Sequence, residues 1–152
     1  MPRWWNWQTR TLEGRMVKTV RVQVPPSASN LIEAAKEASK KAYAPYSNNK
    51  VGASVLTENN KIYTGSNIEN ASYSLTICAE RTAIFNAVLD GQRKIDILVV
   101  YDEKTIYPCG ACLQVLSEFS DNPLIILADK KGVVFYRLKD LLPKPFTHFS
   151  KT

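Results

Sequence analysis

Three cysteines are the residues of this 152-residue chain best suited to chemistry. Cys109 and Cys112 form a Cys-x-x-Cys pair, and Cys78 precedes them along the chain. A Cys-x-x-Cys pair at the start of a helix can direct two thiolates to one metal ion, and a third cysteine fills three of the four positions that zinc prefers. Three protein ligands with one open position are typical of catalytic zinc, whereas structural zinc normally has four. The pattern therefore predicts one Zn²⁺ per chain in a catalytic site.

Charged residues beside the first cysteine fit the same interpretation. Glu80 lies two positions after Cys78 and supplies a carboxylate that can move protons next to an activated water molecule. Three thiolates more than neutralise Zn²⁺ and make it a poorer Lewis acid. We therefore expect helix N-termini at Cys78 and at the Cys-x-x-Cys pair to withdraw charge, and we expect Arg81 to hydrogen-bond a cysteine sulfur.

Other uses of the cysteines need to be weighed. A redox dithiol would use the Cys-x-x-Cys pair, but it needs neither Cys78 nor Glu80. Three buried free cysteines beside a surface acid would leave the spacing without a reason. His148 could be the fourth ligand of a structural zinc module, but it lies in a polar tail, and such a module would give Glu80 no role. We favour the catalytic interpretation.

Helices and strands must bring these motifs together, and the sequence predicts an alternating order of both. The first predicted helix has Asn30 as its N-cap and stops before Pro45. Further helices are predicted over residues 79–89, 109–119 and 138–142. Strands are predicted over residues 51–56, 62–65, 95–101, 124–128 and 133–136. This order indicates an α/β protein, an α-β-α sandwich in which helices flank a mixed five-stranded sheet.

Length and composition narrow the class of protein. With 152 residues, 45% of them hydrophobic, the chain fits one domain that folds without disulfides. No apolar run approaches the roughly 20 residues needed to cross a bilayer, so we expect no membrane partner. The net charge of +6 would favour nucleic acid, but residues 1–30 hold five of the 20 cations and one of the 14 acids. The rest of the chain carries only 15 − 13 = +2, which argues against a nucleic-acid partner.

The beginning of the chain differs in composition from the remainder. We predict a boundary between an atypical leader, residues 1–29, and one enzyme domain, residues 30–152. All three tryptophans lie at positions 4, 5 and 7, and no apolar core of a secretory signal follows them. We favour a start-site artefact, in which a transfer-RNA gene is translated from an upstream start. A disordered or membrane-touching leader and a short strand over residues 18–24 are the alternatives, and the N-terminal mass of the natural protein distinguishes them.

The order of the motifs is similar to that of a known enzyme family. Cys78-Ala79-Glu80 followed by Pro108-Cys109-Gly110-Ala111-Cys112 matches the pattern of zinc-dependent nucleobase deaminases. From residue 35 to residue 146 the chain resembles the small homotetrameric cytidine deaminases. Four further motifs carry this resemblance: Pro45-Tyr46-Ser47, Val51-Gly52-Ala53, Asn67-Ile68-Glu69-Asn70-Ala71 and Leu141-Leu142-Pro143.

The resemblance implies a reaction and assigns its participants. Cys78, Cys109 and Cys112 correspond to the zinc ligands, and Glu80 corresponds to the proton shuttle. The implied activity is hydrolytic deamination of cytidine and 2′-deoxycytidine to uridine and 2′-deoxyuridine plus ammonia, in pyrimidine salvage. Glu80 would take a proton from the attacking water, protonate N3 of the base and pass a proton to the departing amine. We expect its carboxyl to be buried with a raised pKa.

Substrate-binding residues follow from the same resemblance. Asn67 and Glu69 match the ribose-binding positions, although they could also be a solvated strand edge. Ala79 is expected to offer its backbone N–H to the cytosine carbonyl. Tyr73 and Phe146 match positions through which a neighbouring subunit of a homotetramer helps to close the pocket, with packing of the tail as the alternative for Phe146.

The chain also departs from the family. Asn48-Asn49-Lys50 stands where relatives often have an aromatic residue that packs on the base, Leu113 stands where Arg is frequent, and the tail after Phe146 is atypical. We therefore expect altered affinity with unaltered chemistry. A deaminase of a nucleoside antibiotic and a polynucleotide deaminase are the competing interpretations. The reduced thiols and the lack of a secretory signal favour a cytoplasmic location.

Overall fold

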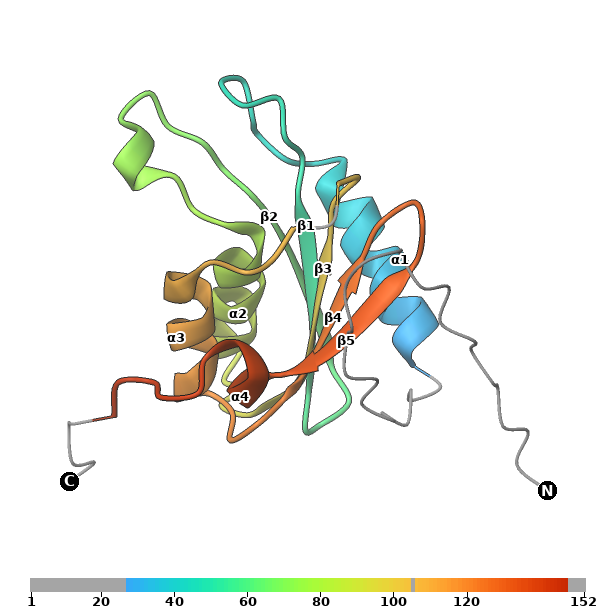
Figure 1. The fold of residues 1–152 in the computed structure, drawn as a ribbon, viewed down its shortest axis with the longest axis vertical. Coiled ribbons are helices and arrows are strands. Elements are labelled where there is room, and N and C mark those ends of the chain that lie inside the picture. Colours follow the sequence, from blue (N-terminus) through green and yellow to red (C-terminus); the bar gives the residue numbers. More distant parts are fainter. Residues whose placement is uncertain (1–26, 105, 148–152) are drawn as a thin grey trace, which may run out of the picture.

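A mixed five-stranded β-sheet forms the centre of the computed structural model, which describes residues 27–104 and 106–147 (Figure 1). The strands are β1 (Gly52–Thr57), β2 (Ile62–Ser66), β3 (Ile95–Tyr101), β4 (Leu124–Ala128) and β5 (Val133–Arg137). The helices are α1 (Ala28–Ser39), α2 (Ala79–Leu89), α3 (Gly110–Glu118) and α4 (Leu138–Leu141), with a 3₁₀ turn η1 (Tyr73–Leu75). The predicted fold class is confirmed.

The strand order brings the two cysteine-bearing segments to one end of the sheet. Neighbouring strands follow the order β2-β1-β3-β4-β5, with β3 and β4 parallel and the other pairs antiparallel. β4 reads Leu-Ile-Ile-Leu-Ala and is buried throughout, as expected of a parallel strand covered on both faces. Because parallel strands need a crossover connection, β3 leads into α3 before β4 begins. The segment between β3 and α3 carries Cys109.

Helices cover both faces of the sheet. α1 lies on one face, and α2 and α3 lie on the other (Figure 1). Leu31 and Ala35 of α1 pack on alternate residues of β3 and β4, namely Ile97, Val99, Tyr101, Leu124, Ile126 and Ala128. On the opposite face, Ala83 and Ile84 of α2 and Leu116 of α3 pack on the other set of alternate residues of β3 and β4, namely Leu98, Val100, Ile125 and Leu127. Such period-two burial on both faces makes an α-β-α sandwich.

Two glycines allow the helices to approach the strands closely. A Cβ placed on Gly65 of β2 would lie 2.3 Å from the Ala83 nitrogen and 2.6 Å from the Ala79 oxygen of α2. A Cβ on Gly52 of β1 would lie 1.9 Å from the Ala35 oxygen of α1. All three neighbouring atoms belong to the backbone, so no side-chain rearrangement can make room. These contacts set the height of α2 and α1 above the sheet.

The helix bounds agree with the sequence at α2 and α3 and differ at α1. Ser27 is the N-cap of α1, so the prediction that Asn30 caps this helix is wrong. The helix ends at Ser39, well before Pro45, because Tyr43 instead pairs its backbone with residues 67–69. Two predictions, a strand over residues 18–24 and a role for His148, fall outside the residues that the structure describes.

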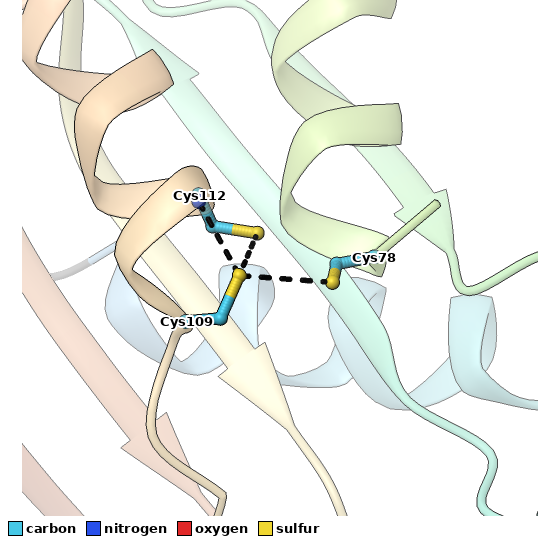
Figure 2. Close-up of side chains that lie close together, drawn as sticks. All are labelled: Cys78, Cys109 and Cys112. Carbon is cyan, nitrogen blue, oxygen red and sulfur yellow. Dashed lines mark hydrogen bonds between the residues drawn. The ribbon is translucent and has the colours of Figure 1, made fainter. Parts of the chain in front are cut away.

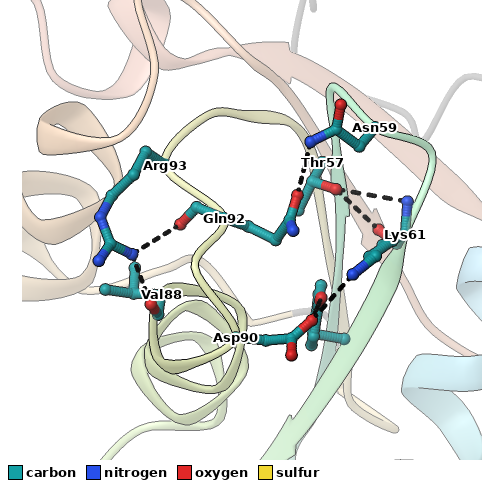
Figure 3. A network of polar contacts seen from close by, with 8 residues as sticks. Thr57, Asn59, Lys61, Val88, Asp90, Gln92 and Arg93 are labelled. Atoms are coloured by element: carbon teal, nitrogen blue, oxygen red, sulfur yellow. Dashed lines mark hydrogen bonds and ion pairs between the residues drawn. The ribbon is translucent and has the colours of Figure 1, made fainter.

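Polar side chains connect the β1–β2 turn with the C-terminal end of α2 (Figure 3). We call this network the far end; its members are Asn59, Lys61, Tyr63, Asp90 and Gln92. Asn59 Nδ2 donates to Gln92 Oε1 at 3.0 Å, and Lys61 Nζ lies 3.1 Å from Asp90 Oδ2. Tyr63 also donates its hydroxyl to Asp90. The Lys61 and Asp90 side chains are 54% and 56% exposed, so solvent screens this ion pair.

Candidate active site

Three cysteine side chains converge from the starts of two helices (Figure 2). Cys78 is the N-cap of α2 and Cys109 is the N-cap of α3. Cys109 Sγ lies 4.0 Å from Cys78 Sγ and 3.4 Å from Cys112 Sγ, and all three sulfur atoms lie within 4.8 Å of one another. Within residues 27–104 and 106–147, no other group of three or more potential ligand residues comes this close together.

The sulfur cluster fits a zinc ion. With a Zn–S bond of about 2.3 Å and tetrahedral angles, two ligand sulfur atoms are about 3.8 Å apart. The observed separations of 3.4 and 4.0 Å bracket that value. An all-thiolate set of three also leaves one tetrahedral position for water or substrate, which is the arrangement of catalytic zinc.

Backbone and side-chain groups around the cluster stabilise thiolates. The Cys112 N–H donates to Cys109 Sγ at 3.5 Å, and Arg81 Nη2 donates to Cys78 Sγ at 3.5 Å. The neighbouring Cys112 thiol and the Arg81 guanidinium lower the pKa of Cys78 to about 5. The hydrogen bond with Cys78 and the burial of the side chain raise the pKa of Cys112. The helix N-termini act in the same direction as Arg81, as predicted from the sequence.

Glu80 lies in the first turn of α2, two positions after the Cys78 cap. Its residue is only 4% exposed, and no lysine or arginine forms an ion pair with it among those found in the described residues. Burial raises the pKa of the Glu80 carboxyl to about 7, and the charge of Cys78 adds to the rise. A carboxyl that titrates near neutrality can both accept and donate a proton. The predicted burial and raised pKa are both confirmed.

Asn67 and Glu69 are buried and hold the backbone of residues 46–51. Glu69 Oε2 accepts the N–H groups of Tyr46 at 2.9 Å and Ser47 at 3.2 Å, and Glu69 Oε1 accepts the Ser47 hydroxyl. Asn67 Oδ1 accepts the Val51 N–H at 2.9 Å, and its Nδ2 donates to the Asn49 carbonyl at 2.8 Å. The two side chains therefore share one partner loop. Ribose binding by this pair stays a prediction.

The remaining residues predicted to bind substrate differ in their exposure to solvent. Ala79, the first residue of α2, is fully buried beside the cysteines. Tyr73 on η1 and Phe146 after α4 each leave 59% of the residue exposed. Figure 1 shows η1 in a loop that projects beyond the start of α2. Asn48, in the stretch that departs from the family, has a left-handed φ of 55°, which Asn tolerates better than bulky residues do.

Sequence reasoning missed two contacts of the site region. The first is the pairing of Ser47 with Glu69, for which the Pro-Tyr-Ser motif was the available signal. The second joins the Gln114 side chain of α3 to the backbone of Phe146. No local sequence pattern predicts this contact, because the tail forms no helix or strand at Phe146.

Comparison with known proteins gives consistent matches over the described body of the chain. A sequence profile of the cytidine and deoxycytidylate deaminase zinc-binding region matches residues 25–128. The chain is 46% identical over 121 residues to the cytidine deaminase of Sporosarcina psychrophila, covering 77% of this chain and 89% of that protein. Identity to the cytidine deaminase of Halalkalibacterium halodurans is 44% over 121 residues, covering 77% and 92%. A crystal structure of cytidine deaminase from Burkholderia pseudomallei superimposes with a TM-score of 0.75 at 46% identity, covering 78% and 98%.

Proposed function

This chain belongs to the cytidine and deoxycytidylate deaminase family, and from that premise we infer that it is a zinc-dependent hydrolase that converts cytidine and 2′-deoxycytidine to uridine and 2′-deoxyuridine with release of ammonia. The observation that carries the inference is the sulfur cluster of Cys78, Cys109 and Cys112 with the buried Glu80 carboxyl beside it. A role in pyrimidine salvage is consistent with free nucleosides as substrates.

Glu80 is the proton carrier of the proposed reaction. When bound by the three cysteines, Zn²⁺ supplies Lewis-acid activation of water at neutral pH. Glu80 accepts a proton from the attacking water and delivers it to N3 of the base, so that C4 accepts the oxygen. A second proton passes through Glu80 to the departing amine, and cytidine plus water becomes uridine plus ammonia. A carboxyl with a pKa of about 7 performs both transfers at little cost in driving force.

Backbone and side-chain groups near the cluster orient the nucleoside. Ala79 at the start of α2 supplies a backbone N–H for the cytosine carbonyl, where the helix N-terminus favours a partial negative charge. Glu69 and Asn67 bind the ribose hydroxyls. Support for this assignment comes from the position of both residues in the Asn67-Ile68-Glu69 motif, and the same side chains also hold the loop over residues 46–51. Arg81 positions Cys78 and offsets the excess thiolate charge.

We assign the protein a homotetrameric state. Three exposed apolar residues on the η1 loop and the tail support this assignment: Tyr73, Leu75 and Phe146. Contact with a neighbouring subunit would bury this apolar surface, which is unfavourable in water. Tyr73 and Phe146 then help to close the pocket of a neighbouring subunit. None of the helices in the described residues is long and apolar enough to cross a membrane. A reducing cytoplasm would keep the three free cysteines available as ligands.

The domain organisation is part of the same proposal. We place the deaminase activity in one domain that follows the atypical leader. The profile match from residue 25 and the start of α1 at Ala28 support a unit that begins at about this point. The mass of the natural N-terminus tests the assignment of the leader.

The first experiment measures the loss of cytosine absorbance on adding purified protein to cytidine, 2′-deoxycytidine and CMP in turn, with zinc content determined on the same sample. Rapid loss with both free nucleosides and none with CMP is expected. Protein with one zinc per chain that converts none of the three would contradict the nucleoside assignment and favour a deaminase of another aminated base.

A further inference from the structure

Cys109 is the most exposed of the three cysteines, and it is also the one that links the other two. Cys109 is exposed, Cys78 is half-buried and Cys112 is buried. The Cys109 sulfur is the common partner of both short sulfur contacts, at 4.0 Å from Cys78 and 3.4 Å from Cys112. Figure 2 shows Cys109 where the preceding segment enters α3. The position of the Cys109 sulfur therefore depends on how firmly that segment is held.

The segment before Cys109 has no regular structure, and one pair of side chains attaches it to the sheet. The hydroxyl groups of Tyr107 and Tyr136 share a hydrogen bond at 2.8 Å. Their ring centroids lie 5.6 Å apart with 55° between the ring planes, a tilted arrangement that is favourable for aromatic rings. Within the part of the chain that the structure describes, residues 106–108 form no other hydrogen bond. We call these two residues the tyrosine pair.

Tyr136 is the fixed member of the tyrosine pair. It lies on β5, where its backbone is in register with Ile125 of the buried strand β4. Its side chain packs against the hydrophobic cluster that β4 shares with α2 and α3. Tyr107, in contrast, is 56% exposed, so burial alone does not hold it in place. The contact with Tyr136 therefore determines where Tyr107 lies.

Pro108 connects this attachment to Cys109. The ring of a proline fixes its φ at about −65°, and it restricts the preceding residue, here Tyr107, to extended conformations. Pro108 is also buried. Cys109 follows directly, with an extended ψ of 163°, and caps α3. Because this short connection has little rotational freedom, a fixed Tyr107 holds the backbone of Cys109.

We propose that Tyr136 is a positioning residue for Cys109, which it holds through Tyr107 and Pro108 so that the site retains its metal ion. This inference rests on the proposed function, in which the three cysteines bind zinc. Groups that orient a metal ligand typically change metal affinity by about 10- to 100-fold when they are removed. A tyrosine pair that only covered the hydrophobic core would stabilise the fold and leave the release of zinc unchanged.

The rate of zinc release distinguishes these two roles. Tyr136→Phe and Tyr107→Phe each keep the ring and remove one hydroxyl of the pair. Zinc-loaded protein is mixed with an excess of a coloured chelator under native conditions, and the transfer of zinc is followed by absorbance. Each variant is expected to release zinc about tenfold faster than the unsubstituted protein. The double variant is expected to be no faster than either single variant, because both substitutions remove the same hydrogen bond.

Tyr63→Phe is the matched control. It also removes a tyrosine hydroxyl that takes part in a hydrogen bond, but at the far end, where the partner is Asp90. Its rate of zinc release is expected to equal that of the unsubstituted protein, although its free energy of unfolding falls as well. Co²⁺ bound in place of zinc supplies a second readout, because its absorption reports how the sulfur ligands are arranged. This absorption is expected to change in Tyr136→Phe and to stay the same in Tyr63→Phe.

The outcomes separate this inference from the proposed function. Tyr136→Phe and Tyr107→Phe proteins that release zinc no faster than Tyr63→Phe, while they bind zinc and deaminate cytidine, would overturn the role of Tyr136 alone. Faster release in Tyr63→Phe to the same extent as in Tyr136→Phe would also overturn it, because the effect would then follow the stability of the fold. Protein that binds no zinc, or Cys109→Ala protein that keeps its zinc, would overturn the proposed function from which the inference starts.

Discussion

The two ends of the sheet treat polar groups in opposite ways. At the end where α2 and α3 begin, the carboxylates of Glu69 and Glu80 lie in residues that are 4% exposed. At the far end, the Lys61–Asp90 pair is more than half exposed. Burying a charge costs several kcal/mol unless something compensates it, whereas an exposed pair contributes about 0–1 kcal/mol. The buried carboxylates therefore lie at the end of the sheet that holds the candidate active site. Substitutions at the far end serve as reference variants for the effects on activity, zinc content and stability predicted below.

The largest contrast is expected from removal of a zinc ligand. Cys109→Ala should lose zinc and reduce turnover by about 10⁴-fold or more, because water that is not bound to the metal has a much higher pKa and gives almost no hydroxide near neutral pH. Metal analysis and the cytidine absorbance assay measure both quantities. Lys61→Ala at the far end is the reference and should keep one zinc per chain. Unchanged zinc content in Cys109→Ala would contradict the assignment of the ligands.

Loss of Glu80, the proposed proton carrier, should come next. Glu80→Gln should retain zinc and lower kcat by about 10²- to 10⁴-fold, because the amide cannot transfer the protons. Glu103→Gln is the matched control, since Glu103 is exposed and pairs only with Lys130 among the ion pairs of the described residues. Turnover by Glu80→Gln at the rate of the control would remove Glu80 from the mechanism.

An intermediate effect is expected at Glu69, one of the two residues proposed to bind the ribose. Glu69→Ala leaves the N–H groups of Tyr46 and Ser47 without their acceptor and removes the proposed partner of the ribose. KM for cytidine should rise by about 10- to 100-fold with little change in zinc content. The control is Glu58→Ala, whose side chain forms an exposed pair with Lys94. Equal KM values for the two variants would assign Glu69 a role in loop structure alone.

A smaller effect is expected from the Ser47 hydroxyl. Its hydrogen bond lowers the pKa of Glu69, with the backbone donors of Tyr46 and Ser47 acting in the same direction. A lowered pKa stabilises the fold above the ordinary pKa of Glu, and this contribution disappears as the pH falls through the lowered value. Ser47→Ala should move the acidic limb of unfolding to higher pH, measured by circular dichroism between pH 3 and 6. An acidic limb that does not move would contradict this cause.

The smallest effect belongs to the far end itself. Asn59→Ala removes one partly exposed hydrogen bond to Gln92 and should lower the free energy of unfolding by about 0.5–1.5 kcal/mol, with kcat and KM unchanged. Denaturant titration and the absorbance assay measure the two. A loss of activity comparable to that of Glu69→Ala would end the distinction between the two ends.

The sequence predicts the residues of the site better than it predicts the course of the loops and the tail around the site. Strong local signals made the cysteines, Glu80 and both helix starts predictable, since the spacing of metal ligands and the capping positions are properties of short segments. The end of α1 was not predictable from Pro45, because the pairing of Tyr43 with residues 67–69 is a long-range contact. The hydrogen bonds between Gln114 and Phe146 likewise join residues that no periodicity relates, and only the folded chain brings them together.

In a mutational scan, Gly65 would look like a catalytic residue although its role is structural, because the position has no room for a side chain. A methyl group at this position would collide with the backbone of α2 between Ala79 and Ala83. Any substitution there must lift the helix start that carries Cys78 and Glu80 away from Cys109. A survey of variants scored by growth on cytidine would therefore rank Gly65 beside the zinc ligands, although it offers the reaction no functional group. Redesign of this enzyme should keep that glycine fixed and look for tolerance on the exposed residues of β2.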